Sequence, residues 1–135
     1  MKSRTRSVGT AISMGPDARR CGASLEHIEA DFVRVRLPFR EEIVTVGDMV
    51  HGGAISGLVD IAATAAAWSG ANPSGPPRGT TVGFSINFLA AARAQELIAG
   101  ARVIRRGKTL SVIDVEVKDA GGEAVARALV TYKLG

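Results

Sequence analysis

The sequence predicts an α+β domain in which one antiparallel sheet curves around a single long helix. Three observations predict it: an almost wholly apolar run at residues 53–68, alternating apolar and polar residues after it, and glycine-containing connections such as RRGK and DAGGE. A helix that is apolar on every face is buried, and an antiparallel sheet is the layer that the other segments can form around it.

Length and composition are typical of an ordinary single domain. The chain has 135 residues, of which 46% are hydrophobic and 22% are charged. We expect residues 1–16 to form a flexible N-terminal tail, which ends at Gly15-Pro16. We expect residues 17–135 to form one domain, because they contain no internal repeat and no change in amino-acid composition.

The balance of charge and aromatic residues limits the partners. The formal net charge of +4 favours anionic ligands without identifying one, and aromatic residues make up only 4% of the chain, too few for stacking on nucleic-acid bases. No stretch reaches the roughly 20 uncharged apolar residues of a membrane span, and the N-terminus lacks the apolar segment of a secretory signal. We therefore expect no nucleic-acid or membrane partner and a cytoplasmic location.

The segments before the helix are short. Residues 17–27 are predicted to hold one short helix. Apolar residues alternate with arginine over residues 33–37, which predicts a half-buried strand that ends at Pro38. A short extended piece follows at residues 42–46, and Gly47-Asp48 turns the chain toward the helix.

The long helix, Gly53 to Trp68, is expected to be buried on all sides. Residues 70–79, GANPSGPPRG, are too rich in glycine and proline for anything but a loop. After it we predict a four-strand antiparallel meander with hairpin loops built on glycine, its strands being Thr80–Leu89, Glu96–Arg105, Leu110–Lys118 and Ala124–Leu134.

One acid stands out in the apolar helix. Asp60 is the only formally charged side chain between Asp48 and Arg78. A buried carboxylate without a partner costs several kcal/mol, and the helix offers no basic side chain to pair with it. Thr64, one turn further on the same face, could help to orient it. We favour a functional role for Asp60 over the structural alternative, a hydrogen bond to a neighbouring chain or to water in a crevice.

The start of the helix is the second candidate feature. In His51-Gly52-Gly53 the first backbone N–H groups have no partners within the helix, and glycine leaves them accessible. The positive end of the helix dipole also favours negative charge there, including charge that develops in a transition state. The alternative is that the glycines only allow close packing at the start of the helix.

Three stretches carry a resemblance to a known family. They are VHGGAISGLVDIAATAAAW, TTVGFSINFLAAARAQE and VIRRGKTLSVIDVEVKDAGGEAVARALVTYKL, which together extend roughly from Phe32 to Leu134. This part of the chain resembles the PaaI-type hotdog acyl-CoA thioesterases. The resemblance implies the hotdog fold, a sheet wrapped around a central helix, and the hydrolysis of an acyl-CoA thioester to a carboxylic acid and free CoA.

The resemblance also implies roles for single residues. Asp60 would be the general base or the nucleophile, and the Gly52 N–H would polarise the thioester carbonyl. Thr81 falls where the family often has a hydroxyl that holds the attacking water. His51 would shape the site or only cap the helix. Thr45 is a departure, since the best-known members have an amide side chain there that helps to place the water.

A CoA-binding region is implied in the same way. Phe88 to Ala92, beginning with Phe88 and Leu89, would line the pantetheine channel, and Arg93 matches a second stretch that contacts CoA. The nucleotide would meet the hairpin residues Arg105, Arg106, Gly107, Lys108 and Thr109. The alternative for each basic residue is a solvated charge on a hairpin.

The family likeness further implies a homodimer or homotetramer whose active site is shared, with Gly52 and Asp60 supplied by different subunits. We expect no cofactor and no metal, because Cys21 is the only cysteine and the two histidines, His27 and His51, form no ligand pattern. Two other functions stay open: a non-catalytic acyl-CoA sensor on the same scaffold, and a hydratase or dehydratase that uses a histidine–acid pair, for which we find no pattern. The acyl group is not identified by the sequence.

Overall fold

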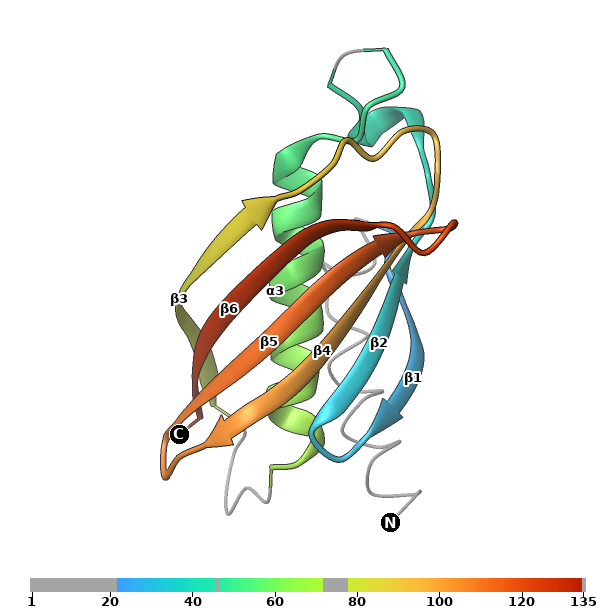
Figure 1. The fold of residues 1–135 in the computed structure, drawn as a ribbon. Coiled ribbons are helices and arrows are strands. Elements are labelled where there is room, and N and C mark those ends of the chain that lie inside the picture. The colour runs from blue at the N-terminus through green and yellow to red at the C-terminus, as the bar shows by residue number, and fades with distance from the viewer. Residues whose placement is uncertain (1–21, 46, 72–77, 135) are drawn as a thin grey trace.

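Helix α3 (Gly52–Ser69) lies against the concave face of an antiparallel sheet, as the computed structural model of residues 22–45, 47–71 and 78–134 shows (Figure 1). The α+β prediction of a sheet curved around one helix is therefore confirmed. Six strands form the sheet in the order β1-β2-β4-β5-β6-β3 within the described residues. Their bounds are β1 Ser24–Glu29, β2 Phe32–Leu37, β3 Gly79–Phe88, β4 Leu97–Arg106, β5 Leu110–Asp119 and β6 Ala124–Leu134.

The core lies between the helix and the inner face of the sheet. Alternate residues of β2, β4, β5 and β6 point into it, which is why these segments alternate in sequence. The helix contributes mainly alanines on this side, so its backbone approaches the sheet closely. Fully buried members include Val33, Leu97, Ala99, Ile113, Val115, Val130, Ala62 and Ala66.

The expectation that α3 is buried on all sides is wrong. Its buried residues, such as Leu58, Val59 and Ala62, lie on the side that faces the sheet. The opposite side is only half-buried, and it carries Gly57, Asp60, Ile61, Thr64 and Trp68. A single sheet covers one side of a helix, so an apolar composition alone overstates the burial.

The predicted four-strand meander is also wrong at its first strand. β3 pairs with β6 at the edge of the sheet, and β4 lies between β2 and β5. The chain between β3 and β4 crosses the N-terminal end of α3, where the Val50 N–H donates to the Ala92 carbonyl and the Ala94 N–H to that of Asp48. Among the strands that the structure describes, β3 therefore has a free edge, along which Val82, Phe84 and Phe88 are exposed.

A strand replaces the short helix expected at residues 17–27. From Ser24 onward the chain forms β1, while residues 17–21, with Cys21, and the predicted tail at residues 1–16 lie outside the described residues. A β-bulge between Leu25 and His27 changes the phase of β1, so that Leu25 and Ile28 both pack against the core. Their spacing of three residues imitates a helix in the sequence.

Near the helix start the extended piece expected at residues 42–46 is wrong at its beginning. Glu41–Ile43 forms a single 3₁₀ turn (η1), closed by the Ile43 N–H on the Arg40 carbonyl, and Val44 then bridges to Val50. Val46 lies outside the described residues, as do residues 72–77 of the predicted loop. The turn at Gly47 is confirmed, with φ +61.

Candidate active site

The start of α3 leaves one backbone donor free. His51 caps the helix: its Nδ1 accepts from the Gly53 N–H at 2.8 Å, and its carbonyl accepts from the N–H groups of Ala54 and Ile55. The Gly52 N–H has no acceptor among the described residues. The free N–H group and the positive end of the helix dipole together favour a group that carries negative charge at this position. For His51 the structure shows the capping contact.

A pocket of about 380 Å³ opens beside this donor. Four residues singled out in the sequence meet around it: Thr45, Gly52, Phe88 and Leu89. The Phe88 ring covers Gly52, since a β-carbon at residue 52 would lie 3.4 Å from Phe88 Cζ. The rest of the lining is Met49, Val50, Ile55, Ala90, Ala91 and Ala92, of which the sequence analysis named only the last three as part of a channel. The lining is therefore mainly apolar, with Gly52 at the helix start as part of it.

Halfway along the helix, Asp60 is held by a residue from β3. The Thr81 hydroxyl donates to Asp60 Oδ1 at 2.6 Å, and both side chains are half-buried. Thr64, the orienting residue suggested by helical spacing, makes no such bond. Asp60 Oδ2 has neither a hydrogen bond nor an ion pair within the described residues, so it is available as a hydrogen-bond acceptor.

A hydrogen-bonded aromatic pair lies close to Asp60. Tyr132 is the cross-strand partner of Thr81, and its hydroxyl accepts from Trp68 Nε1 at 3.0 Å. Burial raises the pKa of the Tyr132 phenol, the hydrogen bond from Trp68 opposes this, and the negative charge of Asp60 raises the pKa further. The sequence analysis missed this pair. One signal was available, since they are the only tyrosine and the only tryptophan of the chain.

Gly52 and Asp60 lie too far apart to act on one carbonyl. Asp60 is eight positions after Gly52 in the helix, which is about 12 Å along the axis. A carbonyl oxygen within hydrogen-bond distance of the Gly52 N–H is therefore out of reach of the same chain's Asp60. One chain thus keeps the free Gly52 N–H, at the helix start, apart from the Asp60 carboxylate, at the middle of the helix.

The basic hairpin residues divide into two kinds. Arg106 is engaged within the chain: its guanidinium pairs with Asp31 at 2.6 Å and donates to the Ala67 carbonyl at 3.0 Å. Arg105 and Lys108 are exposed and make no ion pair within the described residues. Thr109 is exposed beside them. Gly107 is required by the turn, because a β-carbon there would collide with the Leu110 carbonyl oxygen.

Arg93 lies far from this hairpin. It pairs with Asp48 at 3.0 Å, beside the start of α3, whereas the Arg106 contact with Ala67 holds the hairpin at the helix end. The helix is about 27 Å long, so one chain keeps the two basic stretches at opposite ends. The structure therefore brings together the pocket residues, and separately Asp60 with Thr81, but not the two stretches expected to meet CoA.

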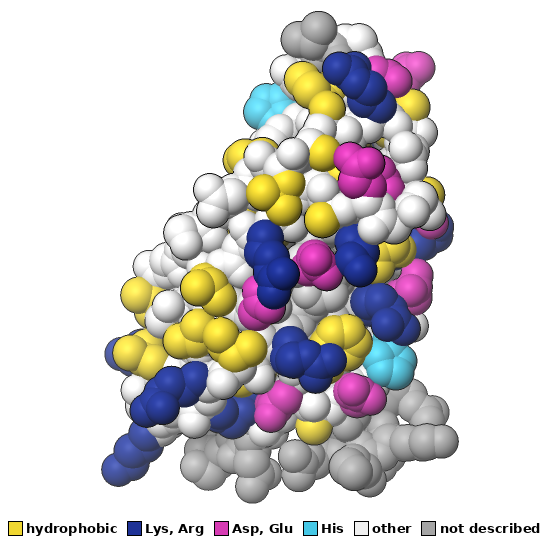
Figure 2. Space-filling view, viewed as in Figure 1, with side chains coloured by type: hydrophobic (Ala, Val, Ile, Leu, Met, Phe, Trp, Pro, Cys, Tyr) yellow, Lys and Arg dark blue, Asp and Glu magenta, His cyan; other side chains and the backbone are white. Residues whose placement is uncertain are grey.

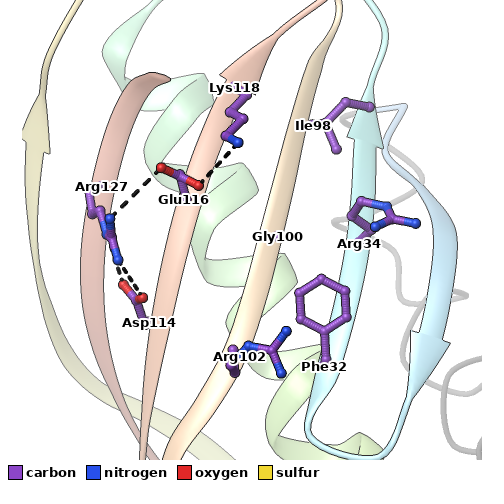
Figure 3. A pocket seen from close by; sticks show the side chains of 9 residues that line it. All are labelled: Phe32, Arg34, Ile98, Gly100, Arg102, Asp114, Glu116, Lys118 and Arg127. Atoms are coloured by element: carbon purple, nitrogen blue, oxygen red, sulfur yellow. Dashed lines mark hydrogen bonds and ion pairs between the residues drawn. The ribbon is translucent and has the colours of Figure 1, made fainter. Parts of the chain in front are cut away.

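A second pocket, of about 300 Å³, lies on the face of the sheet that points away from α3 (Figure 3). Its carboxylates are already paired: Asp114 with Arg127 at 2.8 Å, and Glu116 with Lys118 at 3.6 Å. Figure 2 shows the same face, on which charges of both signs mix with hydrophobic side chains. No residue singled out in the sequence lines this pocket, and we place no chemistry there.

Two further classes of feature are absent from the described residues. No group of three or more His, Cys, Asp or Glu side chains in them could hold a metal ion. None of the helices in residues 22–45, 47–71 and 78–134 has the length and hydropathy needed to cross a membrane.

Comparison with known proteins covers the same part of the chain. Residues 47–126, which include every lining residue of the pocket except Thr45 and also the Asp60–Thr81 pair, match the thioesterase superfamily. A candidate esterase of Saccharolobus solfataricus is 30% identical over 111 residues, covering 82% of this chain and 72% of that protein.

Two solved structures share the fold. The Escherichia coli PaaI protein from the phenylacetic acid degradation operon superimposes with a TM-score of 0.87 at 20% identity, covering 97% of this chain and 93% of PaaI. A hypothetical thioesterase of Streptococcus pneumoniae, solved with coenzyme A, gives a TM-score of 0.79 at 23% identity, covering 88% of this chain and 91% of the other.

Proposed function

Because this chain belongs to the thioesterase superfamily and has the hotdog fold, we propose that it hydrolyses an acyl-CoA thioester to a carboxylic acid and free CoA. The observation that carries the proposal is the state of Asp60. This carboxylate stands on the half-buried side of an apolar helix, with Oδ1 held by Thr81 and Oδ2 available. Such an oriented carboxylate without an ion pair is suited to take a proton from water.

The proposed reaction uses Asp60 and Gly52 together. Asp60 takes a proton from a water molecule whose oxygen attacks the thioester carbon. The negative charge that develops on the carbonyl oxygen is stabilised by the Gly52 N–H at the helix start. When the tetrahedral intermediate collapses, the C–S bond breaks and the CoA sulfur leaves with the proton from Asp60. In the alternative route an Asp60 oxygen attacks the thioester carbon directly, the C–S bond breaks and CoA leaves as the thiolate. Water then cleaves the resulting anhydride, which releases the carboxylic acid and restores Asp60.

A second copy of the chain would complete the site. The free edge of β3 carries exposed apolar side chains, an arrangement that favours pairing with another strand. Thr81, near the start of β3, holds Asp60, and Phe88, at its end, covers Gly52. Antiparallel pairing of two β3 strands about an axis near Phe84 would bring Thr81 opposite the partner's Phe88. Asp60 of one copy would then approach the partner's Gly52, and symmetry would create two equal sites.

The same pairing would join the two basic stretches. The hairpin of one copy, with Arg105 and Lys108, would approach the end of the other copy that carries Arg93. Coenzyme A brings a pyrophosphate and a ribose phosphate, which suit exposed cations. The presence of coenzyme A in the Streptococcus pneumoniae structure supports this part of the proposal. A tetramer would need a further contact, for which the exposed Ile104 and Leu129 are candidates.

One observation favours the second candidate function, a non-catalytic acyl-CoA sensor. Thr45, whose N–H donates to the Met49 carbonyl at 2.8 Å, lines the pocket where the resembling thioesterases carry an amide side chain. A hydroxyl is shorter than an amide and places water differently. Binding alone, however, does not require the carboxylate of Asp60 near an anionic ligand, and we therefore prefer catalysis.

Thiol release from a panel of acyl-CoA substrates tests the proposal, with Asp60→Asn as the matched variant. The amide oxygen of asparagine can still accept from Thr81, so the fold is expected to persist while the base is lost. We expect turnover to fall by about 10²–10⁴-fold, with the affinity for CoA little changed. Near-full activity in Asp60→Asn would exclude the mechanism, and binding of acyl-CoA by the wild type without thiol release would favour the sensor.

A further inference from the structure

Gly57 occupies a position where nothing in the described part of the chain requires glycine. It lies in the interior of α3, and a β-carbon there would meet no heavy atom within 4 Å. The other two glycines of the helix differ: a β-carbon at Gly52 would touch Phe88, and one at Gly53 would lie 3.1 Å from His51 Nδ1. Glycine destabilises a helix interior relative to alanine, so this empty space has a cost that no packing within the described residues explains.

The space lies beside Asp60. Gly57 precedes Asp60 by three residues, and residues three apart in a helix are surface neighbours, with about 5–6 Å between their β-carbon positions. Both belong to the half-buried side of α3, together with Ile61 one turn after Gly57. A group that approaches the Asp60 carboxylate from the direction of the helix start therefore passes over Gly57.

The distance decides which part of a substrate would use this space. In a reactive complex the attacked carbon lies about 3–3.5 Å from the attacking atom, which Asp60 activates. Space within 5–6 Å of the Asp60 β-carbon is therefore next to the carbonyl, and not at the far end of an acyl chain. Ile61 gives this space an apolar neighbour.

We infer that Gly57 is a specificity-determining residue, whose missing side chain admits acyl groups that are branched at the carbon next to the thioester carbonyl. The inference rests on the proposed thioesterase function. A larger side chain at residue 57 would fill the space and reject the branch, while a straight chain of equal carbon number would pass. The selectivity concerns the shape of the acyl group and not its length.

Two substrates of equal composition isolate this effect. Isobutyryl-CoA and n-butyryl-CoA contain the same atoms and differ only in the branch. We expect the wild type to hydrolyse both, with kcat/KM values within about tenfold of each other. In Gly57→Leu the ratio of kcat/KM for isobutyryl-CoA to that for n-butyryl-CoA should fall by about tenfold or more, since one methylene in a filled pocket is worth about 10–200-fold. Gly57→Ala should lower the same ratio less.

Thermal stability provides a second measurement, which is expected to rise in Gly57→Ala while the kcat/KM ratio falls. Because alanine is a better helix former and meets no neighbour at this position, Gly57→Ala should raise the midpoint of thermal unfolding by about 3 °C. A variant that is more stable and yet more selective cannot owe its selectivity to partial unfolding. Gly83→Ala is the matched control: Gly83 also has open space around it, but it pairs with Thr131, away from the inner face, and should leave the ratio unchanged.

The outcomes separate the inference from the proposed function. If the wild type releases thiol from no acyl-CoA, the proposed function fails and the inference fails with it. If the wild type cleaves n-butyryl-CoA but not isobutyryl-CoA, or if Gly57→Leu leaves the ratio within twofold, only the inference is overturned. It is also overturned if Gly57→Leu dissociates the assembled protein on size exclusion, because a second copy of the chain would then fill the space.

Discussion

The two ends of helix α3 are built in opposite ways. At the N-terminal end the Gly52 N–H is free, and the neighbouring Phe88 and Leu89 are 52% and 57% exposed. At the C-terminal end the Ser69 hydroxyl donates to the Ala66 carbonyl and accepts from the Asp31 N–H at 2.9 Å, and Arg106 donates to the Ala67 carbonyl. Within the described residues the helix therefore leaves a backbone donor unpaired at its N-terminal end, whereas side chains and backbone from distant segments bind its C-terminal end.

Glycine stands at both ends, for different reasons. At Gly70, just after the helix, a β-carbon would collide with the Asp31 carboxylate, so glycine is needed for packing. At Gly52 a β-carbon would only reach van der Waals contact with Phe88. The part of Gly52 that matters for the proposed reaction is therefore its N–H rather than its small size.

Removing the Gly52 N–H tests the N-terminal end of α3 and has the largest expected effect on activity. Gly52→Pro deletes the donor at the first position of a helix, where proline is well tolerated. His51, at φ −64 and ψ 135, already has the conformation that a residue before proline adopts. We expect kcat for acyl-CoA hydrolysis to fall by about 10²–10³-fold. Gly52→Ala adds a β-carbon but keeps the N–H, and should retain most of the activity; equal losses in both variants would contradict the role of the donor.

The same variant tests whether a second chain completes the site. Gly52→Pro and Asp60→Asn, each nearly inactive alone, are mixed and allowed to exchange subunits. A mixed dimer with shared sites has one site that carries both substitutions and one that carries neither, so thiol release should partly return. If a tag pull-down proves exchange and no activity returns, each site lies within one chain.

The hairpin near the C-terminal end of α3 contains two kinds of basic residue, and their substitutions should have different effects. Arg105 and Lys108 are exposed, so replacing both by alanine should raise KM for acyl-CoA by about tenfold at low salt, with kcat unchanged. Added salt should reduce the difference, because exposed charges are screened. An unchanged KM would mean that these residues are only solvated hairpin charges.

Arg106→Ala should instead act on stability. Its guanidinium connects Asp31 to the Ala67 carbonyl at the helix end, in a partly exposed position. We expect the free energy of unfolding to fall by about 1–2 kcal/mol, as measured by urea denaturation, while KM of the folded protein stays unchanged. A raised KM without loss of stability would place Arg106 with the other two basic residues and weaken the contrast between the two ends.

The smallest expected effect concerns Tyr132, which lies between the C-terminal end of α3 and Asp60. Because it is the only tyrosine, its phenolate absorbance in a pH titration reports this residue alone. Its pKa is raised above about 10, so the fold favours the neutral phenol; this contribution to stability is present below about pH 10 and is lost as the pH rises through the folded pKa. Asp60→Asn should lower the pKa, and Trp68→Phe should raise it. An unchanged pKa in Asp60→Asn would contradict the proximity of the two groups.

Features that depend on residues close together in the sequence could be predicted, whereas features that depend on contacts between distant segments could not. Strands β4 to β6 and helix α3 were predicted because alternation and apolar runs are local signals, and Asp60 because a lone acid is conspicuous among apolar residues. The order of the strands was not, since the pairing of β3 with β6 depends on contacts between distant segments. β1 was hidden by a bulge that imitates helical spacing.

The site was predictable to the same extent. Thr81 came from a family resemblance, and the structure shows that its hydroxyl donates to Asp60. Tyr132 and Trp68 were missed, because an aromatic residue in a strand or helix resembles any core residue. Arg106 could not be distinguished from Arg105 by sequence, because its partner Asp31 lies 75 positions away.

The free edge of β3 has a consequence for the kinetics of the whole protein. If two copies must meet along this edge to form each site, the law of mass action applies to the enzyme itself. Below the dissociation constant of the dimer, the rate per chain should fall in proportion to the total concentration, and a saturating ligand that bridges both copies should restore it. The amount of active enzyme would then depend on the square of the free chain concentration, so that modest changes in expression would produce larger changes in flux.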